Sequence, residues 1–444
     1  KYEYWKSLGI PYVGISGDLT FQPKTNRNVT IQEQYMKLAP HPFGGIYDGA
    51  KPVLLIRDPE LIRAILIKID PLNAHLITLR GQRWRNIRIK LVPTFSSGKL
   101  RAMYPLMEQC TKVLDGYLDA KLKSSPELEV GDLMMRFAAD VIGVCALGLD
   151  CQAIADEESE FRAAGRRMKP LKWKFSSGRK AEDFFMGVTR EAIKHREENQ
   201  DKRTDFMQLL INLQHEEQRT LQDGAEPLFT DHVVAAHVMI FFLAGFETVS
   251  SAVSSCLYEL ALNPSVANKL HAEIERVLAA HGGKLDYDSL KEMQYMGTVL
   301  EETVRKYPNT GFLKRICTKA YEISNSSLLI KEGTNVLIPT YSLHHDPQYF
   351  PEPEKFDPDR FNEENRSNIV QGAYIPFGDG PRKCIAMRFA MMEARAALAS
   401  IMRKYTVHPT SKTQIPLVFA DGKSGIPRPE KGIHLRFKAR GGQF

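Results

Sequence analysis

A short stretch near the carboxyl end of the chain combines a cysteine with residues that could hold it as an anion. Between Phe377 and Ala386, a Phe and two glycines precede Cys384, and Arg382 stands two residues before it. The next run, Ile385 to Met402, has neither Pro nor Gly and favours a helix. A cysteine at the amino end of a helix is stabilised as a thiolate by free backbone N–H groups and the helix dipole. A thiolate of this kind is one of the axial ligands that bind haem iron, whereas a lone cysteine is more often a buried thiol.

Glu302 and Arg305 stand three residues apart and therefore share one face of a helix. A pair of this kind is common, and it is usually solvated and contributes little to stability. Here it follows the apolar residues Val299 and Leu300 and precedes Tyr307 and Pro308. That context leaves a buried structural pair as the alternative.

The residues from Ala244 to Thr248 interrupt an otherwise apolar run. The run predicts a helix from Thr230 or Asp231 to Asn263, where Pro264 ends it. Gly and Thr weaken a helix interior, so this cluster is a local conflict of the kind expected at a functional site. The Thr248 hydroxyl can bond back to a carbonyl one turn earlier and open the helix to water. The alternative is a simple helix–helix contact at Gly245.

In this order, the three motifs resemble those of cytochromes P450. The cysteine loop of that family reads Phe-x-x-Gly-x-Arg-x-Cys-x-Gly, and the chain departs from it at Ala386, where the family has Gly. The resemblance covers nearly the whole chain. It implies a single catalytic domain over residues 1–444, mainly α with a small β lobe and with a long central helix over the haem. The implied cofactor is haem b, with Cys384 as the ligand of the iron.

The resemblance also implies roles for residues outside the cysteine loop. Thr248 and Glu247 deliver the two protons that oxygen activation consumes. Glu302, Arg305 and Arg360 form a buried structural triad that holds the stretch before the cysteine loop. The resemblance also groups residues that bind the haem and residues that line the substrate pocket; the alternatives are that the aromatic ones are core residues and the cationic ones are surface residues. The haem-binding residues are Cys384, Arg382, Phe377, Trp84, Arg88 and Arg315. The substrate-pocket residues are Phe241, Phe242, Ala244, Phe246, Thr310, Gly311 and Phe312.

Charge, cysteine pattern and apolar stretches indicate which partners and which cellular location to expect. The net charge of +7 is modest and scattered, which argues against a nucleic-acid partner. The six cysteines show no C-x-x-C pair, so a reduced, cytosol-facing protein is expected. The longest apolar stretch, Val233 to Phe246, contains His237 and is shorter than the roughly 20 residues of a membrane span, so we expect a buried helix. In microsomal P450s the segment corresponding to Lys1 follows an N-terminal membrane anchor, so the resemblance implies the endoplasmic reticulum membrane, on its cytoplasmic face.

The β elements are expected at three places. Gly44 to Ile56 predicts a hairpin with an Asp-Gly turn, after which Pro59 starts a short helix. Leu328 to Pro339 predicts a second hairpin with a Gly turn, and Ile415 to Phe437 predicts a last strand pair. Two stretches, Lys68 to Pro71 and Met168 to Phe175, are short against the family, which predicts missing loops there.

Finer resemblance points to insect microsomal P450s of family 6, through Leu91 to Leu100, Asp205 to Leu210 and Phe356 to Phe361. It implies insertion of one oxygen atom of O2 into lipophilic plant toxins, insecticides or other xenobiotics. Because the chain has no dinucleotide fingerprint, electrons are expected from NADPH through cytochrome P450 reductase, with cytochrome b5 as a further partner. The alternatives are an endogenous hormone or fatty-acid substrate, a P450 that rearranges peroxides without a reductase, and a non-catalytic haem-binding sensor.

Overall fold

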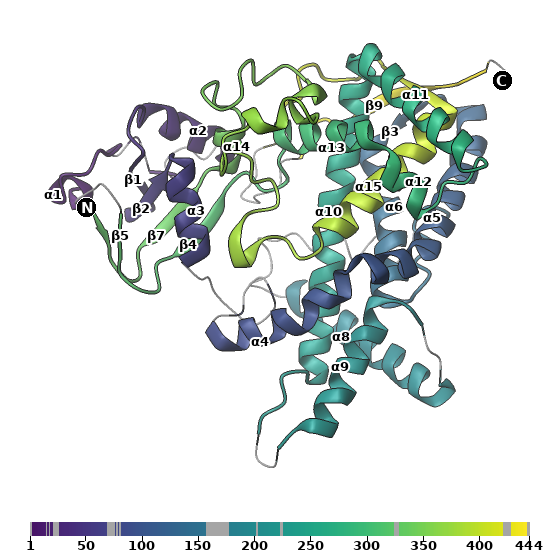
Figure 1. The fold of residues 1–444 in the computed structure, drawn as a ribbon, viewed down its shortest axis with the longest axis horizontal. Coiled ribbons are helices and arrows are strands. Elements are labelled where there is room, and N and C mark those ends of the chain that lie inside the picture. Colours follow the sequence, from purple (N-terminus) through teal and green to yellow (C-terminus); the bar gives the residue numbers. More distant parts are fainter. Residues whose placement is uncertain are drawn as a thin grey trace. The chain divides into compact units, whose positions relative to one another are not determined.

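The structure is a computed structural model that consists of two compact units. It describes residues 2–14, 16, 18–20, 26–68, 76, 79, 81–156, 177–200, 203–222, 225–323, 328–420 and 428–441. Unit 1 comprises residues 1–72, 301–385 and 415–431, and unit 2 comprises residues 73–300, 386–414 and 432–444. Both units combine segments far apart in the sequence (Figure 1). The expectation of a single domain stays a prediction.

Unit 1 is built on a four-stranded sheet with the order β1-β2-β7-β4. The strands β1 (Phe43–Asp48) and β2 (Lys51–Ile56) form the antiparallel hairpin that the sequence predicts, and Pro59 begins α3 (Pro59–Lys68) as expected. The side chain of Trp5 packs on this hairpin and donates a hydrogen bond from Nε1 to the Ile46 carbonyl at 3.0 Å. A Cβ on Gly45 would lie 2.1 Å from Trp5 Cγ, so this close approach requires glycine.

The second predicted hairpin is wrong. The strand β6 (Leu329–Ile330) pairs with β5 (Tyr321–Glu322), and β7 (Asn335–Ile338) leaves it to join the large sheet. There β7 is parallel to β2 and antiparallel to β4 (Leu313–Ile316). The turn at Gly333 exists, with φ +82°, but burial of Val336, Leu337 and Ile338 in the core of unit 1 decides the pairing. Long-range apolar contacts therefore override the local turn signal.

Short elements complete unit 1 and carry the residues before the cysteine. In chain order they are α1 (Tyr4–Ser7), α2 (Arg27–Lys37), α14 (Thr340–His344), and the 3-10 turns η4 (Pro358–Phe361), η5 (Arg366–Asn368) and η6 (Gly380–Arg382). The helix α13 (Gln294–Lys306) crosses the boundary, so its last residues, from 301 on, belong to unit 1.

Unit 2 is mainly helical and contains the long helix α10 (Asp231–Leu262). The Thr230 side chain caps its first turn by accepting from the Val233 N–H, and Asn263 ends it before Pro264, as the sequence predicts. At 1.5 Å per residue α10 is about 48 Å long. Among the described residues it is the one helix long and apolar enough to span a membrane, but 67% of its most apolar window is buried, which fits a core helix.

The helices of unit 2 that pack against α10 include α6, α8 and α15 (Figure 1). A Cβ on Gly245 would lie 2.5 Å from Ile142 Cγ1, so α10 and α6 approach closely at this glycine. The helices are α4 (Gly81–Leu91), η2 (Val92–Phe95), α5 (Ser97–Ser124), α6 (Val130–Ile142), the π-helical η3 (Gly143–Leu147), α8 (Ser177–Asn199), α9 (Phe206–Thr220), α11 (Pro264–Ala280), α12 (Tyr287–Glu292) and α15 (Met387–Lys404). The predictions of a mainly α fold and of a helix after Cys384 are confirmed.

The last predicted strand pair is partly wrong. The sheet of unit 2 has the order β3-β9-β8, in which β8 (Tyr405–Pro409) directly follows α15 and pairs with β9 (His434–Ala439), while β3 (Glu127–Glu129) pairs on the other side. Between 415 and 433 only the isolated bridge Phe419 to Pro429 is seen among the described residues. The first strand was missed because Tyr405 and Val407 continue the apolar pattern of the helix without a turn signal. Of the two stretches predicted to be short, Ile69 to Pro71 and Met168 to Phe175 lie outside the described residues.

Candidate haem-thiolate site

The cysteine loop of unit 1 is held by hydrogen bonds within itself. The Cys384 N–H donates to the Phe377 carbonyl at 2.9 Å, and the Lys383 N–H donates to the Gly380 carbonyl at 3.0 Å. Gly378 and Gly380 have φ values of +70° and +69°, in the left-handed region that favours glycine. The two glycines of the motif therefore supply backbone conformations that bring Phe377 and Cys384 together.

Cys384 differs from the other five cysteines in its exposure. Cys110, Cys145, Cys151, Cys256 and Cys317 are buried, whereas Cys384 is exposed. Burial raises the pKa of Cys145 well above its ordinary value and also raises the pKa of Cys317. Buried neutral thiols are poor metal ligands, because the thiolate is the form that binds a metal. Among the six cysteines, Cys384 is therefore the one whose exposure fits a metal ligand.

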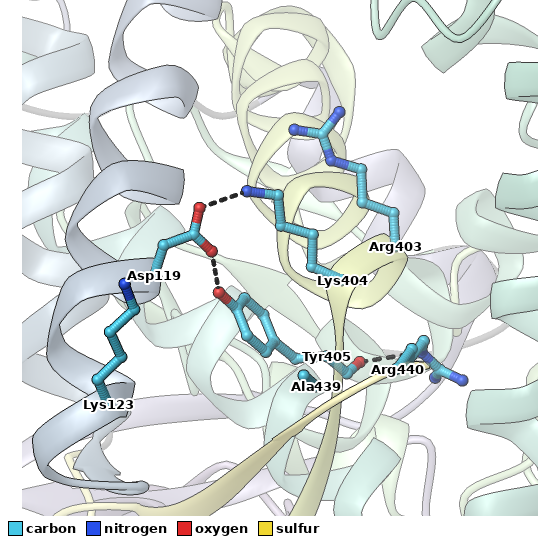
Figure 2. A pocket seen from close by; sticks show the side chains of 7 residues that line it. All are labelled: Asp119, Lys123, Arg403, Lys404, Tyr405, Ala439 and Arg440. Atoms are coloured by element: carbon cyan, nitrogen blue, oxygen red, sulfur yellow. Dashed lines mark hydrogen bonds and ion pairs between the residues drawn. The ribbon is translucent and has the colours of Figure 1, made fainter. Parts of the chain in front are cut away.

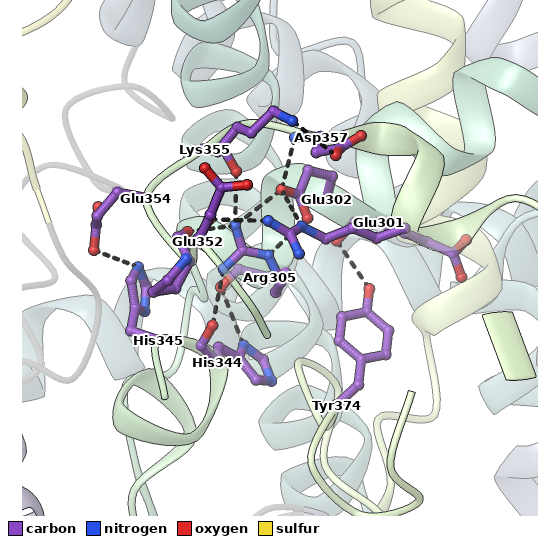
Figure 3. Close-up of polar contacts among 12 residues, drawn as sticks. Glu301, Glu302, Arg305, His344, His345, Glu352, Glu354, Lys355, Asp357 and Tyr374 are labelled. Atoms are coloured by element: carbon purple, nitrogen blue, oxygen red, sulfur yellow. Dashed lines mark hydrogen bonds and ion pairs between the residues drawn. The ribbon is translucent and has the colours of Figure 1, made fainter. Parts of the chain in front are cut away.

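Glu302 and Arg305 form a fully buried ion pair at the end of α13 (Figure 3). The Arg305 guanidinium donates to the Glu302 carboxylate from Nε at 2.6 Å and from Nη2 at 2.9 Å. Glu302 Oε1 also accepts from the Asp357 N–H at 2.9 Å, and Arg360 Nε lies 3.5 Å away. The structure thus brings together the three residues that the resemblance groups. Burial raises the pKa of Glu302, and Arg305, with Asp357 N–H and Arg360, opposes that shift.

Near Thr248, one face of the mostly buried helix α10 is less buried than the rest. Phe241, Ala244 and Thr248 recur at helical spacing on one face, where Ala244 is exposed and the other two are half-buried. The Thr248 hydroxyl donates to the Ala244 carbonyl at 2.6 Å, one turn earlier. The helix nevertheless stays α-helical throughout, so the hydroxyl does not break it. Glu247 is half-buried beside this face.

Other residues assigned to the pocket lie in different surroundings. Phe242 and Phe246 are 0% and 4% exposed and stack on each other with ring centroids 5.7 Å apart. This packing is what the core alternative expects, and the assignment of both residues to the substrate pocket stays a prediction. Gly311 is buried against Asn28, whose Oδ1 would lie 2.0 Å from an added Cβ.

Two further assigned pocket residues lie near the surface of unit 1. The Phe312 ring has the Arg27 guanidinium 5.5 Å and the Lys314 ammonium 5.8 Å from its centroid. Thr310 is half-buried. In unit 2, Ala244 is exposed, whereas Phe241 is half-buried and packs against Phe206, with ring centroids 4.2 Å apart.

The residues assigned to the haem propionates lie on α4 in unit 2 and on β4 and η6 in unit 1. Trp84 and Arg88 share one face of α4, with the guanidinium 5.6 Å from the indole centroid. Trp84 is buried and Arg88 half-buried. In unit 1, Arg315 lies on β4, 7% exposed, and donates to the Lys314 carbonyl at 3.0 Å, while Arg382 ends η6 and is half-buried.

A pocket of about 930 Å³ opens on unit 2 between the ends of α5, α15 and β9 (Figure 2). Its residues are mainly charged, and Asp119 accepts hydrogen bonds there from Lys404 at 2.8 Å and from the Tyr405 hydroxyl. It includes none of the residues assigned above, and its polarity is unlike an apolar substrate pocket.

The residues of unit 1 fit a haem in one respect. Cys384 is exposed, in a loop that two glycines shape, as a ligand of iron must be. Cys384 would hold the iron, and Arg382 and Arg315 of the same unit would hold haem carboxylates. The assignments of Trp84 and Arg88, which belong to unit 2, stay predictions. When bound, a thiolate-ligated haem supplies the oxidising chemistry, with electron density from the sulfur favouring O–O cleavage.

In unit 1, an exposed cysteine in a glycine-containing loop fits the class of haem-thiolate proteins. A model of the cytochrome P450 family matches residues 9–437, and the chain belongs to this family. It is similar to two Drosophila melanogaster proteins, probable cytochrome P450 6a14 and cytochrome P450 6a8. Each is 36% identical, over 98% of the chain and 95% or 94% of the relative. It is also 34% identical to cytochrome P450 6k1 of Blattella germanica, over 98% of the chain and 93% of the relative.

These matches place the chain with the insect family 6 enzymes, and it is a haem-dependent P450 monooxygenase that uses oxygen, a small-molecule substrate and a redox partner. The match to the 6a14 protein extends over 484 positions, more than the 444 residues of the chain. That relative therefore carries internal residues with no counterpart here.

The adjacent residues His344 and His345 match no metal-ligand spacing, so the sequence favours a structural role for both. Both residues are buried and hydrogen-bonded: His344 contacts Arg305 and Ile375, and His345 contacts the Tyr341 carbonyl at 2.9 Å. The sequence contains no signal for the contacts of His344, because its partners lie 39 and 31 residues away.

The neutral state of His345 leads to a pH prediction. Burial lowers the pKa of His345 to about 3, and the charges of Arg305 and Lys306 add to the effect. Below about pH 6.5 the unfolded chain takes up a proton at this residue and the folded chain does not, until about pH 3. The free energy of unfolding therefore decreases as the pH falls through this window, by up to about 1.4 kcal/mol per pH unit.

We expect His345→Phe, which keeps an aromatic ring against Tyr341, to flatten this dependence. Thermal unfolding midpoints measured from about pH 7 to about pH 5 should fall less steeply than in the wild type. His232→Phe, at an exposed position, is the control and should leave the slope unchanged. An unaltered slope in His345→Phe would contradict the prediction.

Proposed function

We propose that this monooxygenase oxidises lipophilic xenobiotics such as plant toxins and insecticides. Its electrons come from NADPH through cytochrome P450 reductase, with cytochrome b5 as a second donor, and its cofactor is haem b. The observation that supports an apolar substrate is the face of α10 on which exposed Ala244 and half-buried Phe241 accompany Thr248, whose hydroxyl bonds to the Ala244 carbonyl. An apolar surface next to a single polar group suits a ligand that is mostly hydrocarbon.

We propose that Thr248 and Glu247 handle the protons of the reaction. Because the Thr248 hydroxyl donates its proton to the Ala244 carbonyl, its lone pairs remain free to accept a hydrogen bond from a water on the open face. Glu247, the preceding residue on the helix, supplies a carboxyl group that can exchange protons with solvent. Thr248 orients the water and Glu247 replenishes its proton.

The proposed location is the cytoplasmic face of the endoplasmic reticulum membrane, where the reductase is met. From their positions near the cysteine loop and the helix of Trp84, we propose Lys383, Arg85 and Lys90 as contacts for an acidic reductase. Arg85 and Lys383 are exposed. Lys90 lies 3.7 Å from Glu217, so its charge is partly neutralised. We therefore place Arg85 and Lys383 first among the contacts.

The proposal is tested by reconstituting the haem-loaded protein with reductase and NADPH. We expect Thr248→Ala and Glu247→Gln to lose product formation by about 100-fold or more while retaining haem and its absorption spectrum. Thr298→Ala removes a similar intrahelical hydroxyl bond, to the Tyr295 carbonyl at 2.8 Å, and should keep full activity. Wild-type turnover in both α10 variants would refute the proton role.

Substrate class requires a separate measurement, because the proton steps are shared by all substrates. A panel of plant toxins, insecticides, fatty acids and steroid hormones is screened for the shift in haem absorption that a ligand produces on binding. Tight binding confined to a hormone or a fatty acid would favour an endogenous substrate and overturn the xenobiotic assignment.

A further inference from the structure

His344 connects two parts of unit 1 that the sequence separates. It ends α14, is 0% exposed, and lies beside the Glu302–Arg305 cluster (Figure 3). Its Nδ1 is 3.2 Å from the Arg305 carbonyl oxygen, and its Nε2 is 3.1 Å from the Ile375 backbone nitrogen. A carbonyl only accepts and a backbone N–H only donates, so the ring is neutral with its proton on Nδ1. Both ring nitrogens are therefore committed.

The contact with Arg305 is reciprocal. Arg305 Nη1 donates to the His344 carbonyl at 2.8 Å, while His344 Nδ1 donates to the Arg305 carbonyl. Arg305 also uses Nε and Nη2 for Glu302 and for carbonyl groups of the stretch that follows α14, among them Pro353 at 2.7 Å. The side chain of His344 thus links this cluster directly to the backbone at Ile375.

Ile375 lies two residues before Phe377, where the cysteine loop begins. Its carbonyl accepts from the Gly378 N–H at 3.0 Å, and the next residue but one, Phe377, accepts from the Cys384 N–H. The ring of His344 is fixed from the sides by Tyr374, 5.5 Å away and nearly parallel, and by Phe350, 6.1 Å away and edge-on. A rigid ring that holds the Ile375 N–H therefore sets the point from which the loop turns toward Cys384.

We propose that His344 is a positioning residue that holds the start of the cysteine loop against the Glu302–Arg305 cluster. The inference rests on the proposed role of Cys384 as the iron ligand. Through Ile375, Gly378 and Phe377, the ring keeps the Cys384 backbone where its sulfur binds iron as a thiolate. Without the acceptor at Nε2, the buried Ile375 N–H has no partner and the loop start is released.

The test uses the haem-loaded protein with two readouts. The first is hydrogen exchange at the Ile375 amide, and the second is the fraction of protein whose reduced, carbonyl-bound spectrum is of the thiolate type. His344→Phe keeps a ring between Tyr374 and Phe350 but makes neither hydrogen bond. We expect Ile375 exchange about 10-fold faster or more, and a clear loss of the thiolate-type fraction. The matched control is His345→Phe, which removes a neighbouring buried histidine without touching Ile375 and should match the wild type in both readouts.

Two polar variants separate positioning from general core stability. His344→Gln can place an acceptor near the Nε2 position, whereas His344→Asn can reach only the Nδ1 position, toward Arg305. We expect Gln to restore Ile375 protection and the thiolate-type fraction better than Asn. If His344→Phe does not accumulate as holoprotein, the comparison of His344→Gln with His344→Asn in these two readouts tests the proposal. The proposal fails if Asn equals or exceeds Gln, if His344→Phe exchanges like the wild type, or if His345→Phe behaves like His344→Phe. Failure of the iron ligand itself is distinguishable, because the wild type would then lack the thiolate-type spectrum while Ile375 exchange still reports on His344.

Discussion

Glu302→Ala is expected to lower the free energy of unfolding by about 3–5 kcal/mol and to yield protein that retains no haem. The carboxylate is fully buried and accepts from Arg305 and the Asp357 N–H, with Arg360 near it. Removing it leaves Arg305 as a buried charge without its counterion. The stretch before the cysteine loop also loses the carboxylate that binds its backbone. The measurements are haem content after purification and chemical unfolding of the protein that remains soluble.

Glu301→Ala is the matched control, one residue away on the same helix. Glu301 pairs with Arg366 at 2.5 Å, and the side chains are 22% and 55% exposed, so the pair belongs to the surface class. Removing a surface pair costs about 0–1 kcal/mol. The Tyr374 hydroxyl bonds to the Glu301 backbone carbonyl at 3.0 Å, which the substitution leaves in place. A Glu302→Ala protein with normal haem and a thiolate-type spectrum would show that the triad does not support the loop.

Cys384→Ser should abolish both the thiolate-type carbonyl spectrum and reductase-dependent turnover. A serine hydroxyl stays neutral near pH 7 and does not supply the anionic sulfur that a haem-thiolate protein requires. The loop itself should persist, because its hydrogen bond to Phe377 comes from the Cys384 backbone N–H. Circular dichroism and thermal unfolding of the variant should therefore resemble those of the wild type without haem.

The control for this experiment is Cys317→Ser, in the same unit. Cys317 is buried and donates from Sγ to the Lys319 carbonyl at 3.0 Å, a bond that serine can keep. We expect its carbonyl spectrum to remain of the thiolate type. Retention of that spectrum in Cys384→Ser, or its loss in Cys317→Ser, would contradict the assignment of Cys384 as the iron ligand.

The predictions that succeeded depend on short-range signals. Thr230 and Pro264 bound α10, and the hydroxyl of Thr248 reaches a carbonyl only four residues earlier. The hairpin of β1 and β2 needs only the Asp-Gly turn between two strands. Capping, turn conformation and helical periodicity are set within a few residues, so they can be read directly from the chain.

Sequence alone determined the identity of the motif residues, the bounds of α10 and the first hairpin. Tertiary structure alone decided that β7 leaves β6 for β2 and β4, that Phe242 and Phe246 stack on each other, and that His344 joins Arg305 to Ile375. The physical reason is that each of these outcomes is a choice among distant partners. Burial of apolar surface and satisfaction of buried polar groups decide it, and neither is set by neighbours along the chain.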